Sequence, residues 1–445
     1  MESGNTVYTK QQRIAELARI HPDVSFTSLA HHIDLVWLYE AFGRTRKDGA
    51  PGVDAMTAEE YEKELNTNLR SLLERAKSGK YYAPPVLRAH IPKDPAKNET
   101  RPIGMPTFED KVLQRAAQMV LEPIYEQDFL DCSYGFRPNR SAHDALQALW
   151  KQMMDIGGGW IIDLDIRKFF DTMVHRNIRE ILKRRVRDGV ITRLIGKWLK
   201  AGVWEAGNIS YPEKGTPQGG VISPMLSNIY LHEVLDSWFE RDVKPRLRGK
   251  AFLIRYADDA VLGFASEEDA RRVMAVLPKR FGRYGLTIHP EKTRVVRFVK
   301  PDDTNMRGRS QDEDNTFNFL GFTHYWAKSR KGTDVIKRKT EKSRFTRALK
   351  KITEWCRTNR HNPVKEQYKT LNQKLRGHYA YYGVTGNNRM VVRFYHKVRR
   401  IWRKWLMRRA RVVSDAWDNF QLLERRYPLA RARIVHSVYL CKATA

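Results

Sequence analysis

Two short apolar segments, residues 251–256 and 260–265, stand on either side of the tripeptide Ala257-Asp258-Asp259. Each segment has the length and side chains of a β-strand, so the pattern predicts a hairpin with two adjacent carboxylates at its tip. Adjacent carboxylates repel each other at neutral pH, and hard oxygen ligands of this kind suit Mg²⁺. Taken alone, such a pair more often marks an ordinary turn, because aspartate is common in turns.

A second acidic pattern lies at residues 160–166, where Asp163 and Asp165 are two positions apart. On a strand these residues face the same side, and the apolar residues between them face the other. A strand with one buried face and two acids opposite would be a rigid platform for ligands. The spacing does not choose between Asp163 and Asp165. Asp165 together with Asp258 could hold two metal ions in the way that phosphoryl transfer requires.

The net charge indicates a polyanionic partner. The chain has 81 Lys and Arg against 51 Asp and Glu, a formal net charge of +30. Residues 331–445 contribute 30 basic and 7 acidic residues, or +23, so the charge is concentrated in the last quarter of the chain. A surplus of this size repels itself unless a polyanion such as nucleic acid neutralises it. Fourteen aromatic residues in the same region suit RNA binding, although Tyr379, Phe394, Trp402 and Trp405 lie on apolar helical faces and are expected mainly in the core.

The three cysteines, Cys132, Cys356 and Cys441, lie far apart and predict neither a zinc site nor a disulfide framework. No apolar run approaches the length of about 18–20 residues that crosses a bilayer. These features favour a reducing, cytoplasmic location in association with nucleic acid, and no membrane partner.

Residue patterns divide the chain into four regions. Residues 1–80 are predicted to be mostly helical, and the proline-rich segment 81–110 to be extended. Between 112 and 300, predicted helices at 112–130, 178–199, 223–240 and 266–284 alternate with strands, which indicates an α+β fold. The polar segment 300–316 is predicted to be a linker. Three amphipathic helices follow it and form a separate basic domain.

Four sequence blocks occur in a particular order: 101–106 (RPIGMP), 133–138 (SYGFRP), 215–228 (GTPQGGVISPMLSN) and 256–259 (YADD). In order and spacing they resemble the blocks of group II intron-encoded reverse transcriptases, a match that runs from about Asp48 through at least Gly383. The chain is identified as a member of that family, of bacterial type. No cysteine-rich or His-Asn-His-like endonuclease segment follows the region that resembles the thumb.

The resemblance implies a right-hand polymerase fold, with fingers and palm followed by an α-helical thumb/maturase domain. The expected domains are an N-terminal extension at 1–80, fingers and palm at 81–300, a linker with the primer grip at 301–340, and the basic thumb/maturase domain at 341–445. The implied activity is RNA-directed DNA synthesis by two-metal nucleotidyl transfer. The implied partners are an RNA template, a DNA primer, dNTPs and a cognate group II intron RNA, bound as a ribonucleoprotein whose splicing the protein promotes.

Residue by residue, the resemblance assigns a metal site. Asp165 matches the first catalytic aspartate, because Phe170, five residues on, occupies the steric-gate position that disfavours ribonucleotides. Asp258 matches the main ligand of the hairpin, and Asp259 its acidic neighbour. The backbone carbonyl of Ile166 completes the implied set for two Mg²⁺ ions, with Mn²⁺ as a substitute.

The remaining assignments concern the nucleotide and the primer. Lys93 and Arg101 resemble the fingers residues that meet the triphosphate, and Gln218 with Gly219 the residues beneath the incoming nucleotide. Lys292 resembles a lysine that protonates pyrophosphate, although a solvated surface lysine is an alternative. The turn formed by Phe319, Leu320 and Gly321 resembles the primer grip, although these residues could serve only as hinge packing.

Three other functions fit parts of the pattern. A maturase that only binds RNA would not need the set of acids together with Gln218. An RNA-directed RNA polymerase is disfavoured by the bulky Phe170. A domesticated reverse transcriptase acting in defence or repair is not separated by the sequence from an intron-encoded one.

Overall fold

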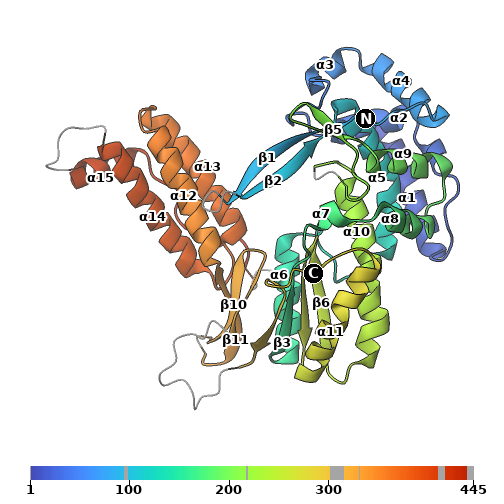
Figure 1. The fold of residues 1–445 in the computed structure, drawn as a ribbon. Helices are drawn as coiled ribbons and strands as arrows, with labels where there is room; N and C mark the ends of the chain where they lie inside the picture. Colours follow the sequence, from blue (N-terminus) through green and yellow to red (C-terminus); the bar gives the residue numbers. More distant parts are fainter. Residues whose placement is uncertain are drawn as a thin grey trace. The chain divides into compact units, whose positions relative to one another are not determined.

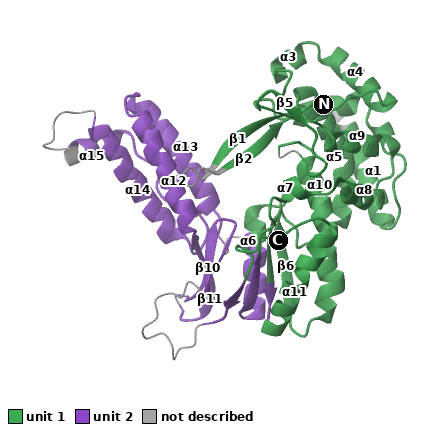
Figure 2. Cartoon of the chain, in the orientation of Figure 1, with its two compact units in different colours: residues 1–145, 164–262, 266–294 green, residues 146–163, 263–265, 295–445 purple. Residues whose placement is uncertain are grey.

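The computed structural model of the protein describes residues 2–94, 99–216, 219–300, 315–329, 331–408 and 416–437. It consists of two compact units, drawn in different colours in Figure 2. Unit 1 comprises residues 1–145, 164–262 and 266–294, and unit 2 comprises residues 146–163, 263–265 and 295–445. Both contain helices and strands (Figure 1), so the predicted α+β class is confirmed. In the part of the chain that the structure describes, no helix is long and apolar enough to cross a membrane.

The first eighty residues of unit 1 are mostly helical, as predicted. They form α1 (Glu2–Ile20), a 3₁₀ turn (Ala30–His32), α2 (Leu35–Arg44), α3 (Ala58–Lys63) and α4 (Leu65–Ser78). Helix α4 ends at Gly79, whose φ of 85° is the left-handed conformation that glycine adopts at helix C-termini. Helix α2 packs against α5 (Phe108–Asp128), where the indole N–H of Trp37 donates to the carbonyl of Ala116 at 3.0 Å.

The extended segment that follows is an antiparallel hairpin of β1 (Val86–Asp94) and β2 (Glu99–Met105). It belongs to a sheet of order β2-β1-β4-β5, with β4 (Val203–Glu205) parallel to β1 and β5 (Asn208–Ser210) antiparallel to β4. The sheet therefore brings residues near 86 and 203 together, and Val86, Arg88 and Val203 line one cavity.

The predicted carboxylate hairpin is present. Strands β6 (Ala251–Tyr256) and β7 (Asp259–Phe264) lie in a sheet of order β6-β7-β3-β8, with β3 (Gly159–Leu164) and β8 (Arg294–Phe298). Strand β7 begins one residue earlier than the apolar pattern indicates. Helices α6 (Ala142–Ile156), α7 (Phe169–Thr172) and α11 (Glu267–Arg283) occupy the segments around these strands.

The single helix predicted at 178–199 is two helices, α8 (His175–Lys183) and α9 (Gly189–Leu199). The break is made by Asp188, whose carboxylate accepts the N–H groups of Val190 and Ile191 in α9 and of Leu29 and Ala30 in the N-terminal segment, at 2.7–2.9 Å. Burial opposes the charge of Asp188, but these four donors hold its pKa below the usual range. Helical periodicity continues through the break, which is why the pattern does not reveal it.

The helix predicted at 223–240 is also modified. It begins as α10 (Ser223–Leu231) and continues as two wider π-helical segments, η2 (His232–Asp236) and η3 (Trp238–Val243), before a 3₁₀ turn, η4 (Lys244–Arg246). Wider turns of this kind displace side chains from the ordinary helical positions and are frequent near functional sites.

In unit 2 a sheet of order β11-β10-β9 precedes four helices. The strands are β9 (Phe317–Phe319), β10 (Phe322–Lys328) and β11 (Asp334–Thr340), and the helices are α12 (Lys342–Thr358), α13 (Val364–Tyr382), α14 (Asn388–Met407) and α15 (Ala416–Arg426). Their shared core includes Tyr379, Phe394 and Trp402, with Trp405 partly buried against it, as predicted. Most of the predicted linker, 301–314, lies outside the described residues.

Candidate active site

The tip of the β6–β7 hairpin carries Asp258 and Asp259 on a tightly turned backbone. Ala257 has a φ of 56°, in the left-handed region that L-residues adopt rarely. The Asp259 side chain is exposed, whereas the Asp258 carboxyl is largely buried. Burial, together with the nearby charge of Asp165, raises the pKa of Asp258, while Arg101 and Arg255 oppose that rise. Two carboxylates that disfavour each other's charge have thus been brought together.

Asp165 follows β3 directly and is held through its backbone by residues 287–293. Its carbonyl accepts the N–H of His289 at 2.8 Å, and the hydroxyl of Thr293 accepts the Asp165 N–H at 3.1 Å. The same hydroxyl lies 3.2 Å from the Asp165 carbonyl. The next residue, Ile166, forms an antiparallel bridge to Ile288. The backbone on both sides of the carboxylate is therefore fixed by contacts that do not use the carboxylate itself.

Lys292 lies beside this carboxylate. Its Nζ is 3.2 Å from Oδ2 of Asp165, and about half of the lysine side chain is exposed, 53%, against 35% for the aspartate. An ion pair this accessible to water adds little to stability, on the order of 0–1 kcal/mol. The lysine is nonetheless a proton-bearing group placed directly at the acidic site.

A buried arginine, Arg255, holds the hairpin tip through a hydrogen bond to the backbone. Sequence patterns did not single it out. Arg255 is fully buried and makes an ion pair with Asp236, Nε to Oδ1 at 2.7 Å and NH2 to Oδ2 at 2.6 Å. Its other N–H groups donate to Asn228 and to the carbonyl of Ala257, both at 2.9 Å, and to Ser133 at 2.7 Å. All five guanidinium N–H donors are used, and one of them holds the residue before Asp258.

Two glycines allow other chain segments to approach the site closely. A Cβ at Gly135 would lie 2.3 Å from the backbone nitrogen of Ala257, and the Gly135 carbonyl accepts the Asn228 amide at 2.7 Å. Gly219 has a φ of 116°, and a Cβ there would lie 2.3 Å from the carbonyl oxygen of Gly104. No side chain fits at either position without displacing backbone.

Phe170 and the loop after Gly215 are bound together. The N–H of Thr216 donates to the carbonyl of Phe170 at 2.8 Å, and the ring of Phe170 is largely buried, edge-on to Phe169 at 5.3 Å between centroids. A cavity of about 230 Å³ adjoins this loop. Its lining includes Arg88, Gly104, Asp171, Lys214 and Thr216.

Of the other residues assigned to the nucleotide, the structure describes the side chain of Arg101 but not those of Lys93 and Gln218. Arg101 lies on β2, opposite Ile91 of β1, and its charge reaches Asp258. Lys93 lies on β1, but its side chain, like the whole of Gln218, is outside the described residues.

The turn assigned to the primer grip lies in unit 2. Phe319 is buried, and Leu320 and Gly321 have φ values of 49° and 76°. The Tyr381 hydroxyl of α13 donates to the Leu320 carbonyl at 2.8 Å. Packing against α13 therefore fixes this turn.

Comparison with known proteins decides the family. Residues 91–324, more than half of the chain, match the family described as reverse transcriptase (RNA-dependent DNA polymerase). The chain belongs to the reverse transcriptase family. Residues 345–421 match a second family, the maturase-specific domain of group II introns, so this reverse transcriptase is of the group II intron type.

The relatives include one protein named as intron-encoded and one named as an intron maturase. The reverse transcriptase is 31% identical over 318 residues to the group II intron-encoded protein LtrA of Lactococcus lactis subsp. cremoris, a match covering 68% of this chain and 52% of LtrA. It is 37% identical over 284 residues to protein YkfC of Escherichia coli (strain K12), covering 57% and 74%. It is 27% identical over 191 residues to nuclear intron maturase 4, mitochondrial, of Arabidopsis thaliana, covering 39% and 24%. The chain spans about half the length of LtrA.

Reverse transcriptases of this family use divalent metal ions. In the described ranges, no group of three or more His, Cys, Asp or Glu side chains is arranged around a common point. The donor set nevertheless suits a hard divalent cation, because Asp165 and Asp258 are carboxylates and the charge of Asp165 adds to the burial that raises the pKa of Asp258. A cation between them would relieve the repulsion that this structure contains.

Proposed function

We propose that this reverse transcriptase copies RNA into DNA at a site formed by Asp165, Asp258 and Asp259. The observation that carries the proposal is the largely buried carboxyl of Asp258 at the hairpin tip, whose pKa is raised by burial and, to a lesser degree, by the charge of Asp165. Holding two like charges together opposes folding unless a bound cation or substrate compensates. A purely structural hairpin has no use for that arrangement.

The metal-binding groups would be the three aspartates and the carbonyl of Ile166, with two Mg²⁺ ions or Mn²⁺ in their place. When bound, such ions activate a primer 3′-hydroxyl and stabilise the leaving pyrophosphate. Lys292, whose Nζ lies 3.2 Å from Oδ2 of Asp165, would protonate the leaving pyrophosphate.

The nucleotide would be held by other groups. Arg101 and Lys93 would meet the triphosphate, where fixed cations offset developing charge. Gln218 and Gly219 would lie beneath the base and sugar, and the ring of Phe170 would exclude a 2′-hydroxyl. The fold is proposed to provide fingers and palm at 81–300, an N-terminal extension at 1–80, a primer grip at Phe319, Leu320 and Gly321 within 301–340, and a thumb at 341–445.

The maturase-specific match supports a second role for the same protein. We infer that residues 341–445 bind the cognate group II intron RNA in a ribonucleoprotein and promote its splicing, with the +23 surplus of residues 331–445 meeting RNA phosphates. The template, primer and dNTPs would then be handled by the remainder of the chain.

Primer extension on an RNA template tests the polymerase proposal. We expect DNA synthesis that requires Mg²⁺ and falls by at least about 10³-fold in Asp258→Asn and Asp165→Asn, because each removes a charged ligand without changing its shape. Asp163→Asn is the matched control: it alters the neighbouring acid and should retain most of the activity.

Two results would contradict the assignment. Robust primer extension by Asp258→Asn would refute the metal site. If Asp163→Asn loses primer extension while Asp165→Asn retains it, the metal ligand is Asp163 and not Asp165. Wild-type protein that promotes splicing but never extends a primer would favour a splicing-only maturase.

A further inference from the structure

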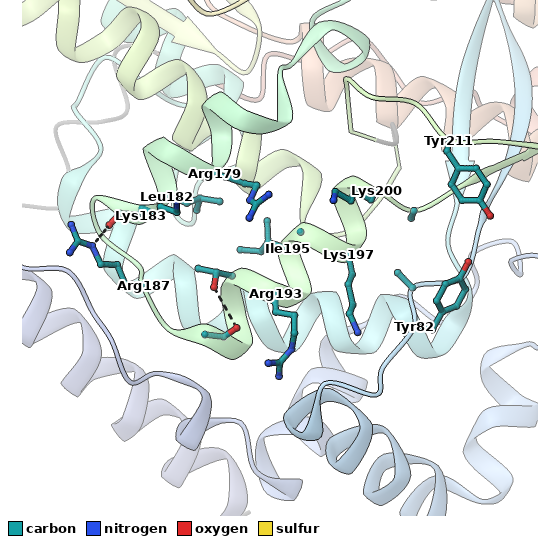
Figure 3. Close-up of a pocket in the computed structure, with 15 residues that line it drawn as sticks. Tyr82, Arg179, Leu182, Lys183, Arg187, Arg193, Ile195, Lys197, Lys200 and Tyr211 are labelled. Atoms are coloured by element: carbon teal, nitrogen blue, oxygen red, sulfur yellow. Dashed lines mark hydrogen bonds between the residues drawn. The ribbon is translucent and has the colours of Figure 1, made fainter.

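A large pocket in unit 1 lies apart from the aspartates. Its volume is about 740 Å³, and it lies between α8, α9, the segment before β1 and the segment after β5 (Figure 3). None of its lining residues is among those assigned above to catalysis, metal or nucleotide. Its size is that of sites that enclose small organic ligands, about 300–1,000 Å³.

The lining is strongly basic. Six of its fifteen described residues are cationic and none is acidic: Arg179, Lys183, Arg187, Arg193, Lys197 and Lys200. Burial lowers the pKa of the nearby His175, and the charges of Lys200 and Arg179 lower it further, so the field in this part of unit 1 is positive. Six like charges around one hollow favour an anionic occupant.

The six cationic side chains differ in their contacts and in their exposure. Arg193 and Lys197 bind carbonyls at the end of α4 and just after it, including Lys77 at 3.1 Å and Gly79 at 2.7 Å, and therefore fasten α9 to the N-terminal extension. Lys183 lies 3.0 Å from Glu180. Arg179 and Lys200 are exposed at the pocket, and Figure 3 shows both side chains on the same side of it.

Two exposed tyrosines stand at one end of the pocket. Tyr82 is 65% exposed and Tyr211 is 63% exposed, and the neighbouring Tyr211 side chain raises the pKa of Tyr82. Figure 3 shows the two rings close together with their hydroxyls turned toward one another. Exposed aromatic rings next to a basic groove are the pattern by which proteins stack unpaired bases while cations meet the phosphates.

We propose that this pocket binds a single-stranded segment of RNA, about two or three nucleotides long, with bases on Tyr82 and Tyr211 and phosphates near Arg179 and Lys200. The inference rests on the proposed function, since it gives an RNA-copying protein a second RNA contact. The tyrosine hydroxyls, and the hydroxyl oxygen of Thr192 as an acceptor because its proton goes to the Asp188 carbonyl at 2.7 Å, would meet 2′-hydroxyls, the group that distinguishes RNA from DNA. A second copy of the chain is disfavoured by the net charge of +30.

The test uses the full chain and a hexanucleotide RNA carrying 4-thiouridine. After irradiation, we expect crosslinks to peptides containing Tyr82 or Tyr211, identified by mass spectrometry. The double variant Arg179→Glu/Lys200→Glu should lose them and reduce the slope of log affinity against log salt by about 1.4, because each single-strand phosphate contact contributes about 0.7. Tyr82→Leu/Tyr211→Leu removes two stacking contacts of about 1–3 kcal/mol each, so it should weaken binding at least about 30-fold and leave the slope unchanged.

The matched control is Lys279→Glu/Arg283→Glu, an equal charge change on exposed residues of α11 that do not line the pocket. Equal loss of crosslinks in the control would overturn the proposal, because bulk charge would then explain the binding. A DNA hexanucleotide of the same sequence, carrying 4-thiothymidine, is irradiated in parallel. Equal crosslinking of this DNA would overturn the choice of RNA. Displacement of the crosslinks by oligoglutamate but not by RNA would indicate an acidic protein partner instead.

Failure of this inference is separable from failure of the proposed function. Asp258→Asn should crosslink like the wild type, and Arg179→Glu/Lys200→Glu should still extend a primer on a short template. If the protein extends a primer but gives no crosslinks to Tyr82 or Tyr211, RNA binding in the pocket is refuted while the proposed polymerase activity stands.

Discussion

The ion pair between Arg255 and Asp236 yields a quantitative prediction. Both side chains are completely buried, and they are joined by two hydrogen bonds of 2.7 and 2.6 Å. Asp236→Asn keeps the shape but leaves the guanidinium charge uncompensated, which costs about 3–5 kcal/mol for a buried pair. Both residues lie in unit 1, which has roughly 270 residues. At about 2.1 cal/mol/K per residue, 1 kcal/mol corresponds to slightly less than 2 °C, so we expect the unfolding temperature to fall by about 5–9 °C.

The control is an ion pair with a similar N–O distance but with both side chains exposed. Arg248 and Glu268 are 2.7 Å apart, and their side chains are 72% and 55% exposed. Exposed pairs contribute about 0–1 kcal/mol, so Glu268→Gln, also in unit 1, should lower the unfolding temperature by at most about 2 °C. Thermal unfolding of both variants is followed by tryptophan fluorescence at one salt concentration.

Asp236→Asn should also affect the candidate active site. Arg255 donates to the Ala257 carbonyl, next to Asp258, so loosening the guanidinium should raise the Mg²⁺ concentration needed for half-maximal primer extension. This is measured well below the unfolding temperature. The reasoning is refuted if Asp236→Asn and Glu268→Gln change the unfolding temperature equally. It is also refuted if Arg255→Met/Asp236→Leu, which removes both charges, is no more stable than Asp236→Asn.

Three further predictions concern other parts of the chain. Phe170→Ala should admit ribonucleotides in primer extension, and unchanged selectivity would dismiss the gate assignment. Gly135→Ala should abolish extension because its Cβ would lie 2.3 Å from the Ala257 nitrogen, whereas Gly282→Ala, with nothing within 4 Å, should not. Burial lowers the pKa of His324 to about 3, so the unfolded chain takes up the proton first, and the stability that depends on neutral His324 should be lost as pH falls from about 6.5 toward 3. Urea unfolding at pH 7 and pH 4.5 should therefore show a smaller difference for His324→Phe than for the wild type.

Local sequence patterns were sufficient for most elements. Strand-length apolar runs predicted β6 and β7 to within one residue, and helical periodicity predicted α12, α13 and α14. These patterns predict the elements because each element buries one face. Apolar residues therefore recur along the sequence with the period of a strand or of a helix. The same patterns missed the break at Asp188 and the π-helical segments after α10, because neither interrupts the apolar periodicity.

The assigned residues depended on different kinds of information. The pair Asp258-Asp259 stands out in the sequence, but spacing alone left Asp163 and Asp165 equivalent, and the choice of Asp165 came from the family resemblance. The approach of Lys292 to Asp165, which are 127 residues apart, has no local signal. Nothing in the residues around Thr293 or Asp236 indicates that they support the aspartates.

The sequence by itself therefore determined the secondary structure around the acidic residues, the family, and the basic character of the last quarter. Only the tertiary structure decided which groups surround the carboxylates: the hydroxyl of Thr293, the ammonium of Lys292, and the Arg255 guanidinium with its five acceptors. It alone also gathered Tyr82, Tyr211 and six cations around one pocket. The physical reason is that periodicity records which face of an element is buried, whereas a hydrogen bond or ion pair joins atoms whose separation along the chain leaves no local trace.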